Sequence, residues 1–346
     1  MTPPLPPPLP PPLPPPLLDV RGLKKYFPIA KGAFGRISGQ VRAVDDVTFT
    51  VDEGETLGLV GESGCGKTTV SRCILRAIDP TEGQVLYHTN DGRVVDLAPM
   101  SRHDLAPLRK EIQMVFQDPF GSLNPRMTLL DNVGEPLLVN GVRNRGERMD
   151  RVAELLRLVG LRPEFMHRFP HAFSGGQRQR IGIARALATN PRLVVADEPV
   201  SALDVSVQAQ VLNLLLELQE RLRLTYLFVA HDLSVVRHIS DRVAVMYVGQ
   251  LVELTPTDAI FERPLHPYTA ALMRAVPVAD PRVRTVDGIL GGEVPSPAAP
   301  PSGCYFHPRC RFTDEICRQE PPPLREISPG HSARCHFAGK LDLAGA

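Results

Sequence analysis

Short apolar runs recur along most of this chain and alternate with segments that have the hydrophobic spacing of helices. The runs that predict strands span residues 20–26, 41–51, 56–60, 111–116, 193–196, 227–230 and 243–248. The segments that predict helices span residues 68–78, 148–158, 181–187 and 205–222. Strands that alternate with helices in this way predict an α/β fold with a buried, largely parallel sheet.

Two terminal segments depart from this alternation. Residues 2–18 contain eleven prolines, which exclude a helix because proline lacks the N–H and clashes with the preceding turn. We expect residues 1–18 to form a proline-rich disordered tail, and a ligand for a proline-reading domain is the alternative.

After residue 263 proline becomes frequent again and four cysteines appear. This change predicts a separate C-terminal extension, residues 264–346, after a nucleotide-binding domain of residues 19–263.

Composition narrows the class of protein. The net charge of +1, from 39 basic and 38 acidic residues, argues against a nucleic-acid partner. No apolar stretch is long enough for a transmembrane helix, and the N-terminus lacks the basic region of a secretory signal. At a membrane, the protein would therefore dock through partner subunits. The six cysteines show no secreted disulfide pattern, so we expect a cytosolic, reducing compartment, where the cluster of four favours metal over disulfides.

Residues 61–68 carry the first candidate chemistry. Their sequence, Gly-Glu-Ser-Gly-Cys-Gly-Lys-Thr, matches the phosphate-loop pattern and lies between a predicted strand and a predicted helix. Glycines let the backbone N–H groups turn toward phosphate, and the helix N-terminus adds positive charge. We expect Lys67 to reach the β- and γ-phosphates and the Thr68 hydroxyl to hold magnesium. The residues expected to contact the nucleotide are Gly61, Ser63, Gly64, Cys65, Gly66, Lys67, Thr68 and Thr69.

Two acids follow the apolar strand at residues 193–196. Their position puts both carboxylates at the carboxyl edge of the sheet, beside the phosphates. We expect Asp197 to bind magnesium, directly or through water, and Glu198 to orient and polarise the attacking water as the general base.

A second anion-binding sequence lies at residues 173–177, Phe-Ser-Gly-Gly-Gln, before a helix predicted from Arg178. With these motifs the chain resembles the ATP-binding cassette ATPases, whose signature is Leu-Ser-Gly-Gly-Gln, with Phe173 in place of leucine. The resemblance implies a cassette fold with a parallel-sheet core, an antiparallel β subdomain and a helical subdomain at about residues 118–185. It also implies a head-to-tail dimer, in which one subunit's signature contacts the partner's ATP. The signature residues are Ser174, Gly175, Gly176 and Gln177.

The same resemblance assigns further roles. Gln117 corresponds to the glutamine that touches magnesium and the attacking water, and His231 to the histidine that contacts the γ-phosphate. Asp204 corresponds to the aspartate of a loop at the dimer interface. Tyr26 or Phe27 should stack on adenine, and the sequence leaves this choice open. Since every motif is intact, the resemblance implies that the cassette binds ATP with Mg²⁺ and hydrolyses it.

A narrower resemblance covers roughly residues 19–340. The stretches at 20–40, 117–127, 170–180 and 263–269 are similar to ATPase subunits of bacterial dipeptide and oligopeptide importers. This implies a second ATPase subunit (identical or paralogous), two permeases, an external solute-binding protein and a peripheral position on the cytoplasmic face of the cell membrane. The alternatives are an importer ATPase for nickel or another small solute, and a soluble cassette protein.

Four cysteines lie in the C-terminal extension: Cys304, Cys310, Cys317 and Cys335. Relatives carry similar sets, which in some resemble a [4Fe–4S] site, and four thiolates suit this cluster or zinc. The close Cys-x-x-Cys pairs that zinc favours are missing. Zinc could instead recruit histidines, and the candidates are His307, His331 and His336. Four ordinary buried thiols are the third alternative. We expect the iron–sulfur cluster, in a structural role.

Overall fold

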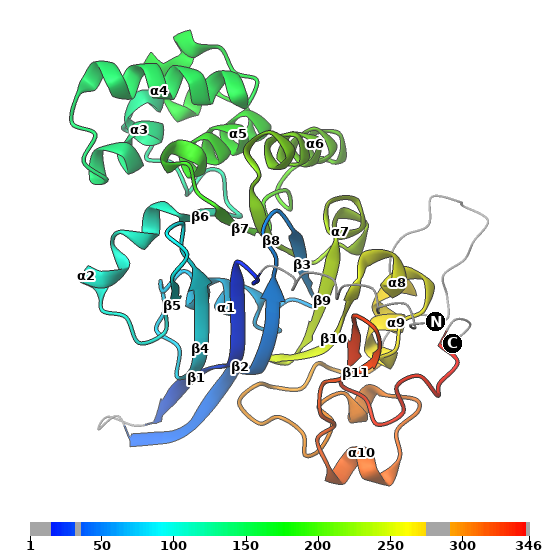
Figure 1. The fold of residues 1–346 in the computed structure, drawn as a ribbon. Helices are drawn as coiled ribbons and strands as arrows, with labels where there is room; N and C mark the ends of the chain where they lie inside the picture. Colours follow the sequence, from blue (N-terminus) through cyan, green and yellow to red (C-terminus); the bar gives the residue numbers. More distant parts are fainter. Residues whose placement is uncertain (1–14, 32–35, 275–290, 344–346) are drawn as a thin grey trace, which may run out of the picture.

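The computed structural model describes residues 15–31, 36–274 and 291–343. The part of the proline-rich segment before residue 15 lies outside these residues. Within them, the chain forms a larger sheet, a smaller sheet and a helical part stacked above the larger sheet (Figure 1). Leu17 and Leu18 are already buried, so the folded chain begins just before the predicted boundary.

The larger sheet contains the parallel core that the sequence predicts. Its strands, in spatial order, are β11 (Arg325–Ser328), β12 (His331–Ala333), β10 (Gln250–Pro256), β9 (Arg242–Tyr247), β3 (Thr56–Val60), β8 (Thr225–Ala230), β7 (Leu193–Asp197) and β6 (Ile112–Val115). The five strands from β9 to β6 run parallel. All residues of β3, β7 and β8 are buried, which explains their continuous apolar sequences.

The smaller sheet is antiparallel, with the order β2 (Arg36–Val51), β1 (Leu18–Lys31), β4 (Glu82–His88) and β5 (Val94–Asp96). The sequence predicted shorter first strands, at residues 20–26 and 41–51. Residues between these two stretches also pair across the hairpin, as Pro28 does with Gln40. Strand pairing satisfies backbone hydrogen bonds without requiring an apolar run, so the polar sequence hid this extension, which projects from the body (Figure 1).

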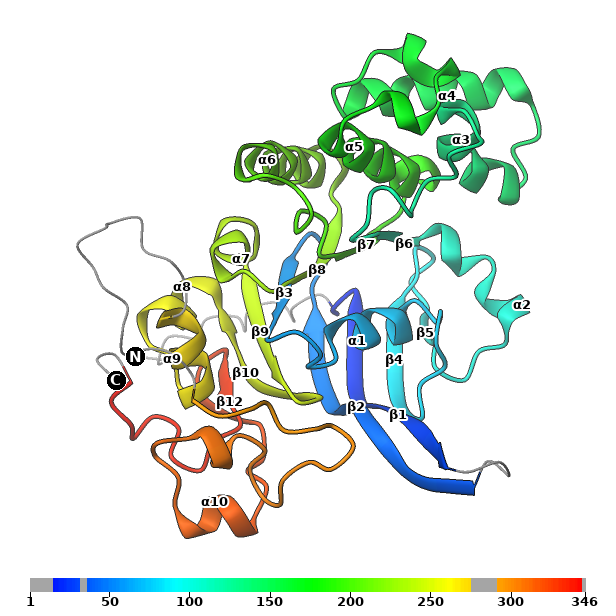
Figure 2. The ribbon, with the colours of Figure 1, turned by 180° about the vertical axis from the view of Figure 1, so that it is seen from behind.

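The helices are α1 (Lys67–Ile74), α2 (Arg102–Leu105), α3 (Leu129–Val139), α4 (Arg145–Leu158), α5 (Gly175–Ala186), α6 (Val205–Leu222), α7 (Leu233–Ile239), α8 (Thr257–Glu262), α9 (Pro267–Arg274) and α10 (Glu315–Gln319). Helices α3 to α6 form the helical part (Figure 2). Helix α5 begins at Gly175, three residues before the predicted start. The physical reason is a capping box, in which Ser174 and Gln177 satisfy each other's backbone N–H groups.

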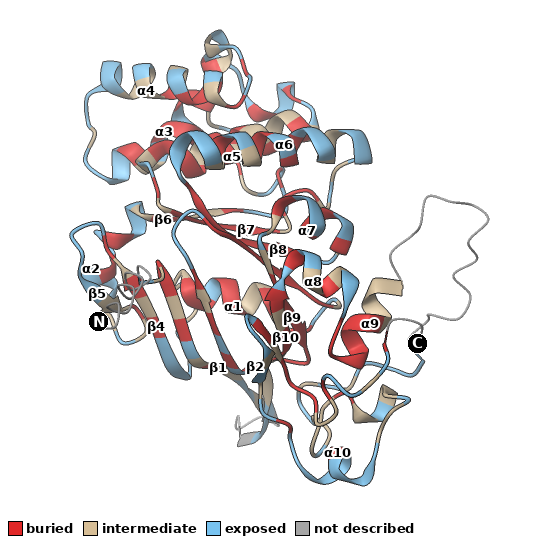
Figure 3. Cartoon of the chain, turned by 45° about the vertical axis from the view of Figure 1, so that its right-hand side comes forward, coloured by how far each residue is buried: buried red, intermediate tan, exposed pale blue. Residues whose placement is uncertain are grey.

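Two apolar cores lie on opposite faces of the larger sheet. One joins this sheet to α1 and the smaller sheet, and the other joins it to the helical part. Strand β7 contributes to both, since Val195 faces the first core and Val194 faces the second. Figure 3 shows buried residues concentrated in the central strands and on the inner sides of the helices.

The sequence predicted a separate C-terminal extension, but in the structure two strands of this extension join the main sheet. Strand β12 pairs with β10, and β11 pairs with β12. The fully buried carboxylate of Glu253 in β10 accepts the N–H groups of Leu265 and His266 at 2.7 and 2.9 Å. It also bonds the His331 ring at 2.7 Å. The extension therefore continues the sheet and is joined to it by buried hydrogen bonds to Glu253. In the described residues, no helix has the length and apolar character needed to cross a bilayer.

Candidate nucleotide-binding site

The predicted phosphate loop connects the buried strand β3 to helix α1. Gly66 has a φ of 109°, and a Cβ atom there would lie 2.1 Å from the carbonyl oxygen of Ala43. Only glycine fits this close approach. The buried Lys67 ammonium donates to the carbonyls of Gly61 at 2.7 Å and Glu62 at 3.1 Å. The backbone of the loop therefore wraps the ammonium group of Lys67, the side chain that the sequence predicts to bind phosphate.

Cys65 belongs to this loop, but its side chain points into the protein. The residue is 3% exposed, and burial raises the pKa of its thiol. Its carbonyl accepts the N–H of Gly249 from the turn between β9 and β10 at 2.8 Å. Only the backbone of Cys65 is therefore placed to serve a nucleotide.

A candidate magnesium site lies at the junction of α1 and β7. The Thr68 hydroxyl donates to Asp197 at 3.1 Å, and Asp197 is 4% exposed. Burial raises the pKa of the Asp197 carboxyl, and the neighbouring Glu198 charge acts in the same direction. A hydroxyl and a carboxylate suit magnesium, which takes its remaining oxygen ligands from phosphates and water. The residues present therefore fit this ion.

Two predicted residues, Gln117 and His231, contact the carboxylate of Glu198. Its Oε2 accepts a hydrogen bond from Gln117 Nε2 at 3.1 Å and lies 3.0 Å from His231 Nδ1. These residues follow β6, β7 and β8, whose carboxyl ends meet at one edge of the sheet. Gln117, which the resemblance also assigned to magnesium, bonds Glu198 here. Glu198 has a φ of 46°, a strained conformation for a non-glycine residue that fixes the direction of its side chain.

The signature residues stand at the start of α5, in the helical part. The exposed Ser174 caps this helix, accepting the N–H of Gln177 at 3.3 Å. A Cβ atom on Gly176 would lie 2.3 Å from a methyl group of Val207 in α6, so glycine is required for this helix packing. Views from opposite sides place α5 well away from the phosphate loop at α1 (Figures 1 and 2). One chain thus does not bring its signature to its own phosphate loop.

Asp204 caps the neighbouring helix α6. Its carboxylate accepts the Ser206 hydroxyl at 2.8 Å and the Val207 N–H at 3.1 Å. The hydrogen bond from Ser206 is the largest influence that lowers the pKa of this carboxyl. The predicted interface residue therefore has a capping role within its own chain.

The two candidates for adenine stacking have different surroundings. The Tyr26 hydroxyl donates to Asp45, whose N–H bonds the Gly249 carbonyl at 2.8 Å. Gly249 also contacts the phosphate loop through Cys65. Phe27 is 36% exposed and lies under the Lys25 ammonium. Because adjacent strand residues face opposite sides, only Tyr26 is linked through these bonds to the phosphate loop.

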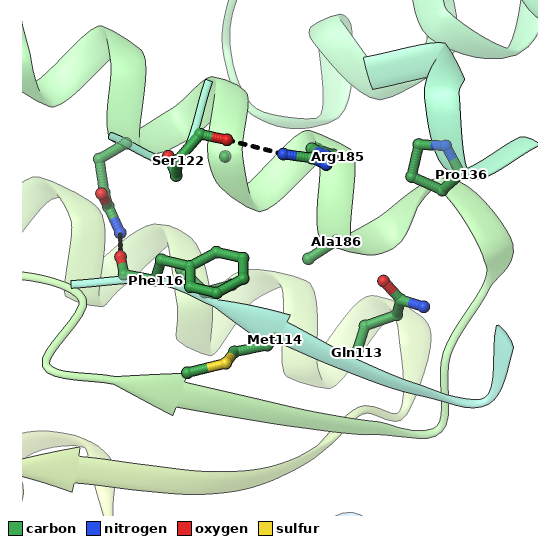
Figure 4. Close-up of a pocket in the computed structure, with 10 residues that line it drawn as sticks. Gln113, Met114, Phe116, Ser122, Pro136, Arg185 and Ala186 are labelled. Carbon is green, nitrogen blue, oxygen red and sulfur yellow. Dashed lines mark hydrogen bonds between the residues drawn. The ribbon is translucent and has the colours of Figure 1, made fainter. Parts of the chain in front are cut away.

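A pocket lies directly before Gln117, where β6 passes under α3 and α5 (Figure 4). Met114 and Phe116 line its floor, and Pro136 and Arg185 line its other side. Arg185 is held by the carbonyl of Ser122 at 2.7 Å. Phe116 is 48% exposed. No sequence motif indicates this pocket, because its walls come from segments distant in sequence.

The four cysteines line one small cavity in the C-terminal extension, together with aromatic and histidine side chains. Burial raises the pKa of the Cys304 thiol to about 12 and that of Cys335 to about 11. Among the residues that the structure describes, no three Cys, His, Asp or Glu side chains are arranged to hold a metal ion. The fold thus places the four predicted cysteines beside one cavity, but it does not arrange their side chains as the ligands of a single ion.

Two family models match the chain. The model for the ABC transporter family matches residues 44–201, which contain the phosphate loop and the signature. The model for the oligopeptide/dipeptide transporter C-terminal region matches residues 252–317, which contain three of the four clustered cysteines.

Curated relatives match nearly the whole chain. The oligopeptide transport ATP-binding protein AppF of Bacillus subtilis is 55% identical over 93% of this chain and 97% of its own length. A probable peptide ABC transporter ATP-binding protein of Sinorhizobium fredii is 52% identical over 92% of this chain and 89% of its own.

Solved structures share the core fold. A dimeric, post-hydrolysis structure of the ATP-binding cassette MJ0796 with ADP and Pi has a TM-score of 0.60 and 30% identity, covering 69% of this chain and 98% of that chain. The structure of cbiO1 from Clostridium perfringens, part of an ABC transporter complex, has a TM-score of 0.60 and 26% identity, covering 72% and 91%.

Proposed function

Because the chain belongs to the family of ATP-binding subunits of oligopeptide and dipeptide ABC transporters, we propose that it hydrolyses ATP to drive the import of short peptides. The observation that carries this proposal is the convergence of Gln117 and His231 on the carboxylate of Glu198. This arrangement supports a complete hydrolytic site beside the phosphate loop.

In the proposed mechanism, each residue acts on a separate part of the ATP. Lys67 neutralises charge on the phosphates, while Thr68 and Asp197 would hold Mg²⁺, which would supply positive charge to offset the charge that develops during hydrolysis. Glu198 accepts a proton from the attacking water. Gln117 and His231 hold the Glu198 carboxylate in position for this transfer. Tyr26 is the preferred adenine stacker, since its hydroxyl is anchored toward the phosphate loop.

The hydrolytic site is proposed to be shared between two cassettes. The signature at Ser174 lies away from the phosphate loop of its own chain (Figures 1 and 2), and its helix N-terminus suits an anion. A second cassette, identical or paralogous, would bring its own signature to this ATP. The dimeric arrangement of the MJ0796 structure supports this geometry.

The pocket before Gln117 is the proposed docking site for a helix of a permease. Its wall residue Phe116 and the nearby Phe120 are 48% and 60% exposed. Phe116 immediately precedes the glutamine that holds Glu198, so a helix seated there could link membrane movement to hydrolysis. This contact would hold the chain on the cytoplasmic face of the membrane, below two permeases that receive solute from an external binding protein.

The cysteine cavity is proposed to hold a [4Fe–4S] cluster. The donor set fits the cluster, because four cysteines line one cavity. Tetrahedral zinc requires all ligands to meet at one atom, whereas a four-iron cluster gives each thiolate its own iron. Bound there, the cluster would link the segments that carry the cysteines and stabilise the extension. Anaerobic absorption spectra with iron and zinc analysis test this, and a protein that contains zinc without iron, or neither metal, would contradict it.

Peptide uptake by the reconstituted transporter tests the main proposal. Lys67→Ala should abolish ATP binding and uptake of a labelled oligopeptide, because the phosphates lose their main cation. Lys110→Ala, at an exposed lysine, is the matched control and should transport normally. Uptake of nickel ions without any peptide uptake would show that the transported solute is nickel and not a peptide. Unchanged ATP affinity in Lys67→Ala would refute the phosphate-loop assignment.

A further inference from the structure

The C-terminal extension reaches the phosphate loop at Glu62. Two nitrogens of the Arg309 guanidinium donate to the Glu62 carboxylate, Nη1 to Oε2 at 2.9 Å and Nη2 to Oε1 at 3.2 Å. The backbone N–H of Glu62 donates to the hydroxyl of Tyr268 at 2.9 Å. Both the side chain and the backbone of this loop residue are therefore held by residues outside the core of the cassette.

Both holding side chains are themselves fixed by packing. The Arg309 side chain is 4% exposed, and its ion pair with Glu62 raises the pKa of the guanidinium. A paired fork of this kind fixes orientation as well as charge. Tyr268 is fully buried, and its ring packs on Tyr247 and Phe306, with centroids 4.6 and 5.5 Å away. Neither group can follow a moving loop freely.

Tyr268 is connected to the main sheet through a chain of hydrogen bonds. Its N–H donates to the ring of His266 at 3.0 Å. The N–H of His266 donates in turn to the buried carboxylate of Glu253 in β10. The position of the Tyr268 hydroxyl is thus set by the sheet edge on which the extension is built.

A second contact joins the extension to the candidate adenine side of the site. The Tyr305 hydroxyl donates to Asp45 at 2.8 Å, and Asp45 also accepts the hydroxyl of Tyr26. The N–H of Arg42 donates to the carbonyl of Pro297 at 2.9 Å. The extension therefore touches both ends of the candidate nucleotide site.

We propose that Arg309 and Tyr268 are positioning residues for ATP binding, which hold Glu62 so that the phosphate loop keeps its binding shape before nucleotide arrives. The inference rests on the proposed function, because it requires residues 61–68 to bind phosphate. Ordering one loop residue on binding costs about 1–2 kcal/mol, and a loop that is already ordered avoids this cost. The extension is thereby part of the nucleotide-binding machinery as well as a family-specific appendage.

Equilibrium ATP binding to the purified full-length chain tests the inference. Tyr268→Phe removes only the hydroxyl that holds Glu62, and it changes no charge. We expect it to raise the Kd for ATP about tenfold, the effect of ordering one residue on binding. Tyr226→Phe is the matched control, since it also removes a buried tyrosine hydroxyl, one that bonds the carbonyl of Leu215. The control should leave the Kd unchanged.

Substitutions of arginine test whether Arg309 acts through its fixed position or only through its positive charge. Arg309→Lys keeps the positive charge but loses the two-nitrogen fork, and it should also raise the Kd several-fold. If Arg309 acted only through its charge near the phosphates, Arg309→Lys would bind ATP like the unmodified chain. Arg311→Lys, the same substitution at an exposed neighbour, is the matched control and should leave the Kd unchanged.

Steady-state kinetics of the assembled transporter give the second readout. A positioning role predicts that Tyr268→Phe raises KM for ATP while kcat at saturating ATP stays near its original value. The inference is wrong if Tyr268→Phe and Arg309→Lys both leave Kd and KM unchanged. If Lys67→Ala still loses ATP binding in that case, the phosphate-loop assignment stands. Unchanged binding in Lys67→Ala would instead overturn the phosphate-loop assignment. If Arg309→Lys does not fold, the Kd and KM of Tyr268→Phe decide whether the inference holds.

Discussion

The sharpest prediction concerns Glu198, the carboxylate on which Gln117 and His231 converge. Glu198→Gln keeps the size of the side chain and one acceptor oxygen, but its amide cannot take a proton from water at neutral pH. A positioned general base contributes about 10²- to 10⁴-fold to the rate. This factor corresponds to about 2.7–5.5 kcal/mol in the activation barrier. We therefore expect kcat to fall by at least 100-fold.

Binding should respond differently from turnover. The variant leaves Lys67 and the Thr68–Asp197 pair intact, so its Kd for ATP should remain within about threefold of the unmodified value, a change of roughly 0.6 kcal/mol. Because ATP persists in the shared site, the cassette dimer should accumulate.

Single-turnover hydrolysis and size-exclusion chromatography with ATP and Mg²⁺ measure these two effects. Glu220→Gln, the same chemical change at an exposed position of α6, is the control and should hydrolyse ATP normally. A Glu198→Gln variant that retains more than a tenth of the rate would refute the assignment of Glu198 as general base.

Three other substitutions probe separate parts of the structure. Glu253→Gln should lower the free energy of unfolding, measured by denaturation in urea, by about 1–3 kcal/mol, because an NH₂ group replaces one acceptor oxygen and leaves a buried donor unpaired; a loss below about 0.5 kcal/mol would contradict this. Ser174→Ala should destabilise α5 by about 1 kcal/mol and abolish ATPase activity while the isolated chain still binds ATP; normal turnover would exclude the shared site. Asp197→Asn should stabilise the nucleotide-free chain at neutral pH, because burial raises the pKa of Asp197 and makes its charge unfavourable when folded. The gain should disappear as pH falls through that raised pKa, where the original carboxyl is protonated, and denaturation at several pH values measures it.

Local motifs made much of the nucleotide site predictable. The phosphate loop, the acids after β7 and the signature are each continuous in sequence, and their chemistry follows from a few neighbouring residues. The parallel core was also predictable, because strands β3, β7 and β8 are buried on both faces and are therefore apolar throughout. The start of α5 was predicted too late, since glycines at 175 and 176 disguised a helix that Ser174 caps.

Contacts between distant segments could not be predicted in the same way. The choice between Tyr26 and Phe27 depends on Asp45, which neither residue neighbours in sequence. The pocket beside Gln117 is built from β6, α3 and α5, so no single stretch of sequence contains its pattern.

By itself, the sequence predicted which chemical groups handle the nucleotide, because short motifs place those groups on adjacent strand ends and helix starts. Only the tertiary structure decided that the C-terminal extension continues the main sheet through β12 and holds Glu62 through Tyr268 and Arg309. The two sides of this contact are about 200 residues or more apart in the chain. Hydrogen bonds over such separations leave no periodic signal in the sequence, since they depend on where the whole sheet brings each side chain.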